Sequence, residues 1–491
     1  MSELLTGLAA EIARHGVDHA FGVPGGGASL ELIDALTREA VTFHSTAHEG
    51  AAAVMAGTFG RLTGKAGVAS AIKGPGLANM VPGMAACQLE SWPMVAMTEA
   101  YGPDAAKAHK RMDHAALASG VSKGHAGLSS DGPGFADLAA LAEAETPAPV
   151  LLDLVERPTV LPPSTTSDLA PPLDAIASAE RPVVIAGTMA IRAGWSDRLN
   201  ALQLPVFSTA AAKGVVDETL PHAAGVYTGV GLERVPEATL LARADLVVGL
   251  GLRDAELLSG PAFEVPFVNV ETPSAGALFD MLADKPWGVD DVVSATGALR
   301  RYMLDGGFLP AHALRAVAAA FPDGVRVVID TGYFCTIAEH AWQAPQADRC
   351  LSSGSGRYMG IGLAQAVGAA LIDDSVPTVL LAGDGGIGPF FAEARLVAEA
   401  RRPLVVLHMS DGGYGSVRTR AVSANLTQAP LLFADRGWRA AFDGIGFATT
   451  RVESEDRLAA ALAGWRPAEA PLFVELPFDP DAYQAMVRGI R

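Results

Sequence analysis

The sequence predicts an α/β protein with doubly wound parallel sheets, because two patterns alternate along its 491 residues. Short apolar runs of strand length are separated by longer segments whose apolar residues recur at helical spacing, which is typical of parallel sheets with helices on both faces. Half of the residues are apolar and only 18% are charged, so each domain can bury a core. At roughly 100 to 200 residues per domain, the length predicts two to four domains.

The first α/β segment covers residues 1–160. It begins with an amphipathic helix, because apolar residues recur at helical spacing from Leu4 to Ile12. Four later runs have the length and composition of buried strands. They are residues 19–23, 67–72, 93–97 and 149–154.

Two further α/β segments follow a linker. Proline and serine crowd residues 157–172, which favours a connection between domains. The second segment covers residues 173–300, and the third covers 308–491 and opens with a helix near 311–320. The strands expected in these two segments are residues 181–187, 244–251, 325–330, 378–383 and 403–409.

Charge and cysteine content exclude several classes of function. With 36 basic and 54 acidic residues the net charge is −18, which argues against nucleic acid as the main partner, although a local pocket for a small anion is still allowed. The three cysteines have no spacing typical of a disulfide framework or a zinc site. The acidic N-terminus is unlike a secretory signal, and no stretch has the length of a membrane span, so we expect a cytoplasmic protein.

Two of the expected strands end in an aspartate followed by glycines. Asp384 follows the strand at 378–383, and Asp411 follows the strand at 403–409. Parallel strands place both acids at one carboxyl edge, where open α/β sheets bind ligands. Two carboxylates with a backbone carbonyl suit Mg²⁺, and glycines let N–H groups approach phosphates. A single Gly-Asp-Gly also suits an aspartate that caps a helix, but the second acid favours the metal site.

This stretch resembles the thiamine diphosphate (ThDP) enzymes of the acetolactate synthase, benzoylformate decarboxylase and pyruvate decarboxylase group. The signature of that group is Gly-Asp-Gly, a helix, and a strand that ends in Asn-Asn. Here Ser410 and Asp411 replace the asparagine pair, which keeps an oxygen ligand and adds one negative charge. The resemblance implies that Asp384, Asp411 and the carbonyl of Gly413 bind Mg²⁺. It also implies that the diphosphate is surrounded by Gly385, Gly386, Tyr414 and Gly415.

The N-terminal segment resembles the other half of the same family. The runs 21–26, 48–53 and 73–79 look like its first strand and turn, its glutamate helix and its Ser-Gly-Pro-Gly turn. The resemblance implies that Glu49 is catalytic, binds the cofactor and exchanges a proton with its aminopyrimidine ring. Without the family, a glutamate in the first turn of a helix is ordinarily a charge favoured by the helix dipole.

The resemblance covers nearly the whole chain and implies an architecture. Residues 1–160 correspond to a pyrimidine-binding domain, 173–300 to a central Rossmann-like domain, and 308–491 to a diphosphate-binding domain. Met359 is the residue implied to bend the cofactor, although an ordinary core methionine is the alternative. The family also implies a homodimer, or a dimer of dimers, with active sites at the subunit interface.

The implied reaction is decarboxylation of a 2-oxo acid, which ends in release of an aldehyde or in carboligation to a second carbonyl compound. Pyruvate decarboxylases carry an adjacent histidine pair, whereas this chain has only His109 and His114 in that region. Substrate candidates are Gly26, Lys73 and His114. Lys73 replaces a small hydroxyl residue of the family, so we hypothesise that it binds the carboxylate or another polar group of the substrate. A surface lysine is the alternative.

Two rival functions stay open. The central segment could bind FAD, as in an oxidoreductase, but the run 187–190 lacks a second glycine at dinucleotide spacing, so FAD is not supported. A non-catalytic ThDP-binding protein on the same fold is the other rival. Retention of both Glu49 and Asp384 argues against it.

Overall fold

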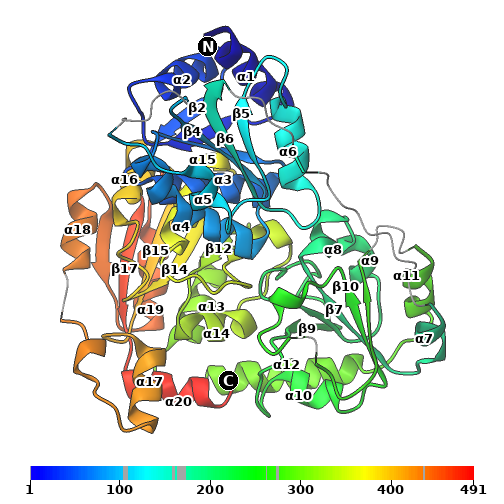
Figure 1. Ribbon diagram of the computed structural model, residues 1–491. Coiled ribbons are helices and arrows are strands. Elements are labelled where there is room, and N and C mark those ends of the chain that lie inside the picture. Colours follow the sequence, from blue (N-terminus) through cyan, green and yellow to red (C-terminus); the bar gives the residue numbers. More distant parts are fainter. Residues whose placement is uncertain are drawn as a thin grey trace. The chain divides into compact units, whose positions relative to one another are not determined.

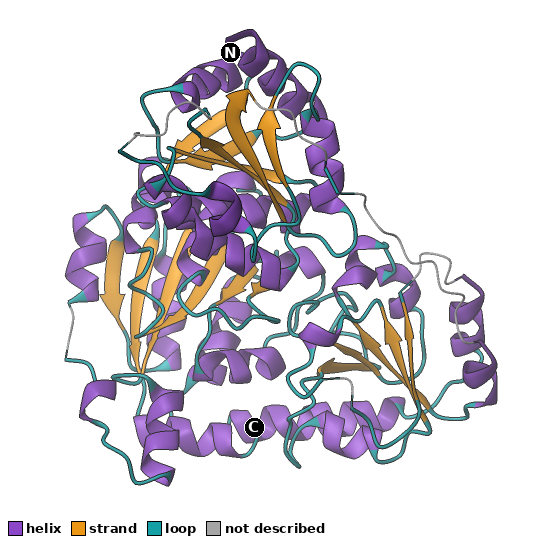
Figure 2. Cartoon of the chain, in the orientation of Figure 1, coloured by secondary structure: helices purple, strands orange, loops and turns teal. Residues whose placement is uncertain are grey.

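The computed structural model describes residues 2–102, 109–156, 161–162, 173–260, 262–271, 276–434 and 437–491. These residues form three sheets, and all pairs of neighbouring strands in them are parallel. Helices alternate with the strands along the chain (Figures 1 and 2). The predicted fold class is therefore confirmed, whereas most of the predicted linker at 157–172 lies outside the described residues.

The chain forms two compact units. Unit 1 contains residues 1–166, 363–375 and 389–402, and unit 2 contains the rest of the chain. The predicted domain boundaries stay predictions.

The sheet of unit 1 has the strand order β2-β1-β3-β4-β6-β5. Helices α1, α2 and α6 share one buried core with it, formed by side chains such as Leu8, Leu36, Val95 and Leu138. The strands are β1 His19–Gly22, β2 Thr42–Ser45, β3 Gly67–Ala71, β4 Met94–Glu99, β5 His125–Leu128 and β6 Pro149–Glu156. The helices are α1 Ser2–His15, α2 Ala28–Arg38, α3 Glu49–Thr63, α4 Pro75–Glu90, α5 His114–Ala118, α6 Phe135–Glu143, α15 Gly362–Ile372, η3 Phe391–Glu393 and α16 Ala394–Glu399.

The central sheet, in unit 2, has the order β11-β10-β7-β8-β9. Two buried clusters, which contain Val184 and Val183 respectively, cover its two faces. Its strands are β7 Pro182–Ala186, β8 Val206–Ser208, β9 Ala223–Val226, β10 Leu246–Leu250 and β11 Phe267–Val270. Its helices are α7 Leu173–Ser178, α8 Thr188–Arg192, α9 Ser196–Asn200, α10 Pro236–Leu241, η1 Asp254–Glu256, α11 Gly276–Ala283 and α12 Val289–Met303.

The third sheet, also in unit 2, has the order β13-β12-β14-β15-β17-β16. Helices α13, α14, α19 and α20 share a buried core with one of its faces, around Leu314, Ile337, Leu381 and Val474. Its strands are β12 Arg326–Ile329, β13 Cys350–Ser352, β14 Thr378–Gly383, β15 Leu404–Ser410, β16 Ala448–Arg451 and β17 Leu472–Pro477. The other elements are α13 Pro310–Ala320, α14 Tyr333–Ala341, η2 Ala347–Arg349, α17 Gly415–Ser423, η4 Ala429–Leu431, α18 Trp438–Gly444, α19 Glu455–Gly464 and α20 Pro480–Arg488.

The first and third sheets repeat one topology. In each, the strand order runs second, first, third, fourth, sixth, fifth, so the direction of winding reverses between the first and third strands. Open α/β sheets bind ligands at such a switch point, outside the carboxyl ends of the strands. The two places to search are therefore the carboxyl ends of β1 and β3 and those of β12 and β14. All nine strands expected from the sequence are present, within a few residues of their expected ends.

Among the described residues, none of the helices combines the length and the apolar character required to cross a bilayer.

Candidate functional site

A cavity of about 300 Å³ lies at the switch point of the third sheet. The segments that follow β12, β14 and β15 form most of its wall, and one residue comes from α20. Its lining residues include Thr331–Phe334, Met359, Gly383–Gly386, Met409, Asp411, Gly413–Val417 and Tyr483. Five segments that are distant in the sequence thus contribute to one ligand-sized space.

Two helices begin at this cavity. The first residues of α14 and of α17 line it, so the N–H groups that start each helix lie at its wall. Such N–H groups have no partner within their helix and attract anions. A cavity at two helix N-termini is therefore suited to a group with several negative oxygens, such as a diphosphate.

The glycines beside the cavity leave no room for side chains. A Cβ added to Gly385 would lie 2.5 Å from a ring carbon of Tyr414 and 3.0 Å from the sulfur of Met359. A Cβ added to Gly415 would lie 1.9 Å from Oδ2 of Asp411. Bare backbone at both positions fits the predicted diphosphate contacts, which also include Tyr414.

Asp384 organises the loop after β15. Its Oδ2 accepts hydrogen bonds from the backbone N–H groups of Asp411, Gly412 and Gly413 at 3.0, 3.0 and 3.3 Å. Its Oδ1 accepts one from the Ser410 hydroxyl at 2.9 Å and lies 3.1 Å from Nε2 of His408. Burial alone would raise the pKa of Asp384, but His408 and these hydrogen bonds outweigh it and lower the pKa. Asp384 is therefore a fixed, ionised carboxylate.

Asp411 lines the same cavity, but its pKa is shifted in the opposite direction from that of Asp384. Burial, and then the charge of Asp384, raise its pKa to about 6. Two carboxylates that repel each other in one cavity are a donor set suited to a divalent cation. No group of three or more His, Cys, Asp or Glu side chains that could hold a metal occurs in the described part of the chain. The predicted Mg²⁺ site comprises two acids and the Gly413 carbonyl, so a search for three side chains does not test it.

Met359 and Gly386 lie beside this site in different environments. Met359 lines the cavity and is 41% exposed, so it is not a core methionine. Gly386 is buried, and a Cβ there would lie 1.8 Å from Oδ2 of Asp330. Asp330, which follows β12, accepts a hydrogen bond from Gly360 N–H at 2.9 Å, and burial raises its pKa to about 6. Asp330 thus binds the loop that contains Met359 and packs closely against Gly386, a position that the sequence motifs did not indicate.

Glu49 lies at the start of α3 in unit 1 and is 7% exposed. The Asn79 side chain donates a hydrogen bond to its Oε2 at 3.1 Å. Helices α3 and α4 cross closely, since a Cβ on Gly83 would lie 2.1 Å from the Gly50 carbonyl oxygen. The small residues of both helices therefore fix Glu49 and Asn79 relative to each other.

Lys73 contacts a buried acid at the switch point of the first sheet. Lys73 forms an ion pair with Glu99, which is 2% exposed and ends β4. Glu99 also accepts hydrogen bonds from Gly27 N–H at 3.0 Å and from the Ser29 hydroxyl at 2.6 Å. Burial alone would raise the pKa of Glu99, but Lys73 and Ser29 lower it. Gly26 lies in this loop with nothing within 4 Å of an added Cβ.

His114 holds the turn that carries Lys73. Gly74 N–H donates to its Nε2 at 3.1 Å, so its Nδ1 donates to Oδ1 of Asp153 at 2.6 Å. His125 contacts the other oxygen of Asp153 at 2.7 Å. Burial would raise the pKa of Asp153, but the two histidines lower it to about 2. His114 is thus buried, whereas His109 is exposed, as expected for a loop histidine.

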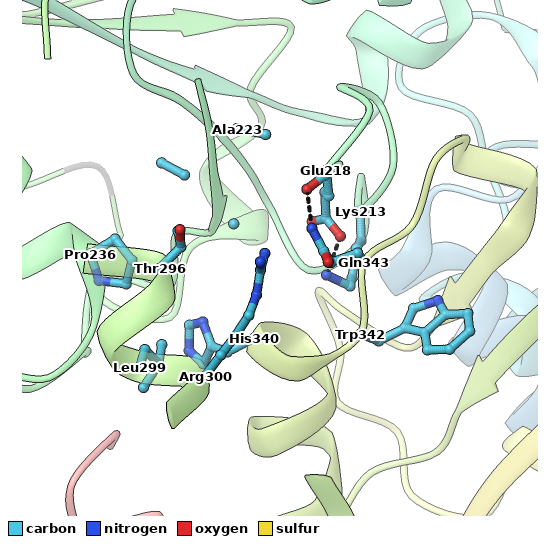
Figure 3. A pocket seen from close by; sticks show the side chains of 12 residues that line it. Lys213, Glu218, Ala223, Pro236, Thr296, Leu299, Arg300, His340, Trp342 and Gln343 are labelled. Carbon is cyan, nitrogen blue, oxygen red and sulfur yellow. Dashed lines mark hydrogen bonds and ion pairs between the residues drawn. The ribbon is translucent and has the colours of Figure 1, made fainter. Parts of the chain in front are cut away.

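A separate, smaller cavity lies in unit 2. Figure 3 shows it beside the buried ion pair between Lys213 and Glu218, which are 2.5 Å apart. Thr296, Arg300 and His340 also line it. Its volume of about 20 Å³ accommodates little more than one water molecule. Its lining does not include residues 187–190, so this cavity does not test the FAD alternative.

The fold and this site together define a class: an α/β protein with a ligand-sized cavity at the switch point of a parallel sheet, where two helices begin. Three family models of thiamine pyrophosphate (another name for ThDP) enzymes match the chain: the N-terminal TPP binding domain at residues 3–118, the central domain at 170–271 and the C-terminal TPP binding domain at 330–476. The chain therefore belongs to the thiamine pyrophosphate enzyme family, and the predicted resemblance is confirmed.

Curated relatives agree with this assignment. The chain is 28% identical to the acetolactate synthase large subunit of Parasynechococcus marenigrum, over 83% of this chain and 76% of the relative. It is 25% identical to acetolactate synthase of Bacillus subtilis, over 95% and 92%. It is 28% identical to a probable 2-ketoarginine decarboxylase of Pseudomonas aeruginosa, over 86% and 84%. Two domain descriptions name TPP binding, and none indicates FAD.

Proposed function

We propose that the chain is a ThDP- and Mg²⁺-dependent enzyme that decarboxylates a 2-oxo acid. The observation that carries this proposal is the cavity at the third sheet, where two helix N-termini and the acids Asp384 and Asp411 occur together. Similarity to acetolactate synthases and to a probable 2-ketoarginine decarboxylase supports the same reaction class. We also propose residues 1–160, 173–300 and 308–491 as its three domains.

The predicted metal-binding, cofactor-binding and catalytic residues have the following roles in this proposal. Asp384, Asp411 and the Gly413 carbonyl would hold Mg²⁺, and Gly385, Gly386, Tyr414 and Gly415 would surround the diphosphate. Met359 would support the bent cofactor. When bound, ThDP supplies an electron sink for cleavage of the bond beside the substrate carbonyl. The buried carboxyl group of Glu49 would exchange a proton with the aminopyrimidine ring.

We propose a homodimer, or a dimer of dimers, with active sites at the subunit interface. This follows from family membership.

The product is either an aldehyde or a 2-hydroxy ketone formed with a second carbonyl compound. Incubating the enzyme with one 2-oxo acid, with and without added aldehyde, and identifying the products by mass spectrometry distinguishes these outcomes.

Binding of the cofactor is the direct test of the proposed function. ThDP with Mg²⁺ at about 100 times the dissociation constant should raise the melting temperature by about 5 °C, because a ligand of the folded state stabilises it. Differential scanning fluorimetry with Mg²⁺ alone, ThDP alone and both together makes the measurement. No shift with both present, together with no CO₂ release from any 2-oxo acid, would reject the function.

The role of Lys73 gives a second prediction. Its ion pair with Glu99 leaves the lysine side chain 23% exposed, so the ammonium group can still reach a substrate anion. Lys73→Ala should raise KM for the 2-oxo acid about 10-fold, the loss expected for a charge-assisted hydrogen bond. Steady-state kinetics against several 2-oxo acids measures this. Lys73→Arg, which keeps a cation beside Glu99, should restore part of the affinity. An unchanged KM for every 2-oxo acid would remove Lys73 from the substrate site.

A further inference from the structure

Tyr483 is a buried residue of the cavity that no predicted role includes. It lies in α20, lines the cavity, and is 1% exposed. Within the described residues, its hydroxyl has no hydrogen-bond partner. A buried hydroxyl without a partner lowers stability, so a natural sequence keeps one where something else requires it.

The helix that carries Tyr483 is held in place by its other polar groups. The Gln484 side chain donates to the Thr419 hydroxyl of α17 at 2.7 Å, and Arg418 of α17 lies 3.7 Å from Asp481. The Tyr302 hydroxyl donates to the carbonyl oxygen of Met486 at 3.1 Å. Figure 1 shows α20 beside α17. The Tyr483 ring is therefore fixed, and its hydroxyl has little freedom to find another partner.

The surroundings of the hydroxyl determine what it can do. The hydroxyl is buried within the cavity wall. A tyrosine hydroxyl is protonated near neutral pH, so it is available as a donor. Its ring lies 6.0 Å from that of Tyr333, which begins α14 and donates its own hydroxyl to Thr419. The Tyr483 ring thus lies beside that of Tyr333 at the wall of the cavity at which α14 and α17 begin.

We propose that the Tyr483 hydroxyl donates a hydrogen bond to the diphosphate of the bound cofactor. This inference rests on the proposed function, because it concerns the same site. It gives the unpartnered donor an acceptor that is absent from the apoprotein. It also gives the C-terminal helix a part in cofactor binding. The predicted diphosphate contacts come from the segments after β14 and β15, so this contact would be independent of them.

Tyr483→Phe tests the inference with two opposite readouts. The dissociation constants for ThDP and for inorganic pyrophosphate, both with Mg²⁺, should rise about 10- to 100-fold, as expected for loss of a hydrogen bond to a charged group. The melting temperature of the apoprotein should stay the same or rise, because the variant removes an unpartnered hydroxyl. Fluorescence titration and scanning fluorimetry of the purified apoprotein measure these two quantities.

Tyr302→Phe is the matched control, since it removes a tyrosine hydroxyl that holds the same helix but does not line the cavity. It should lower the melting temperature and leave both dissociation constants unchanged. Unchanged dissociation constants in Tyr483→Phe, when the wild type binds both ligands, would overturn the inference alone. Equal loss of affinity in both variants would also overturn it, because helix position would then be the cause. A wild type that binds neither ligand would overturn the proposed function as well.

Discussion

Glu49→Gln should lower kcat for decarboxylation by about 10²- to 10⁴-fold, the usual contribution of a group that transfers a proton. The side chain is 7% exposed and accepts a hydrogen bond from Asn79. Glutamine has the same shape, and its carbonyl oxygen can still accept that bond. It cannot exchange a proton near neutral pH. The substitution should therefore abolish proton transfer and leave folding intact.

The measurement is CO₂ release at saturating 2-oxo acid, together with the ThDP dissociation constant and the melting temperature of each variant. Glu143→Gln is a matched control in the same unit. Its carboxylate accepts a hydrogen bond from Ala66 N–H at 2.7 Å, just before β3 begins, and so lies at the opposite edge of the sheet. That control should keep wild-type kcat. Wild-type kcat in Glu49→Gln would show that proton transfer uses another group.

The sequence was most informative where function depends on the ends of strands. Runs such as 378–383 and 403–409 are apolar enough to identify as strands, and parallel pairing then places Asp384 and Asp411 at one edge without further information. The same reasoning applies to Asp330 after β12, and a search of every strand end for acids would have found it.

Partners across the sheet and from distant helices were harder to predict. Glu99 ends β4, and its pairing with Lys73 depends on β3 and β4 being neighbours, which apolar patterns do not specify. No sequence pattern indicated that Tyr483 belongs to the cavity. Only the packing of α20 places this tyrosine there. Residues 363–375 and 389–402 belong to compact unit 1, although they follow it in the chain by more than 190 residues, and apolar patterns do not indicate such an association. Tertiary packing decides such positions.

A pair of matched substitutions at the proposed metal site is expected to have opposite outcomes. In Asp384→Asn, the amide oxygen can accept the three N–H bonds that hold the turn at residues 411–413, so the loop should persist. The lost charge should weaken ThDP binding in Mg²⁺ by about 100-fold or more, because even residues that only orient metal ligands contribute about 10- to 100-fold.

Asp411→Asn should instead retain binding or strengthen it. Asparagine supplies the oxygen that the family signature has at this position, and the change removes the repulsion that raises the pKa of Asp411. Isothermal titration of ThDP at several Mg²⁺ concentrations compares the two variants, with the melting temperatures of both apoproteins as the control for folding. If Asp384→Asn kept wild-type affinity at limiting Mg²⁺, or if the two variants lost affinity equally, the assignment of these acids to the metal would be wrong. The difference between the variants is the informative quantity, because both replace a carboxylate with an amide in the same cavity.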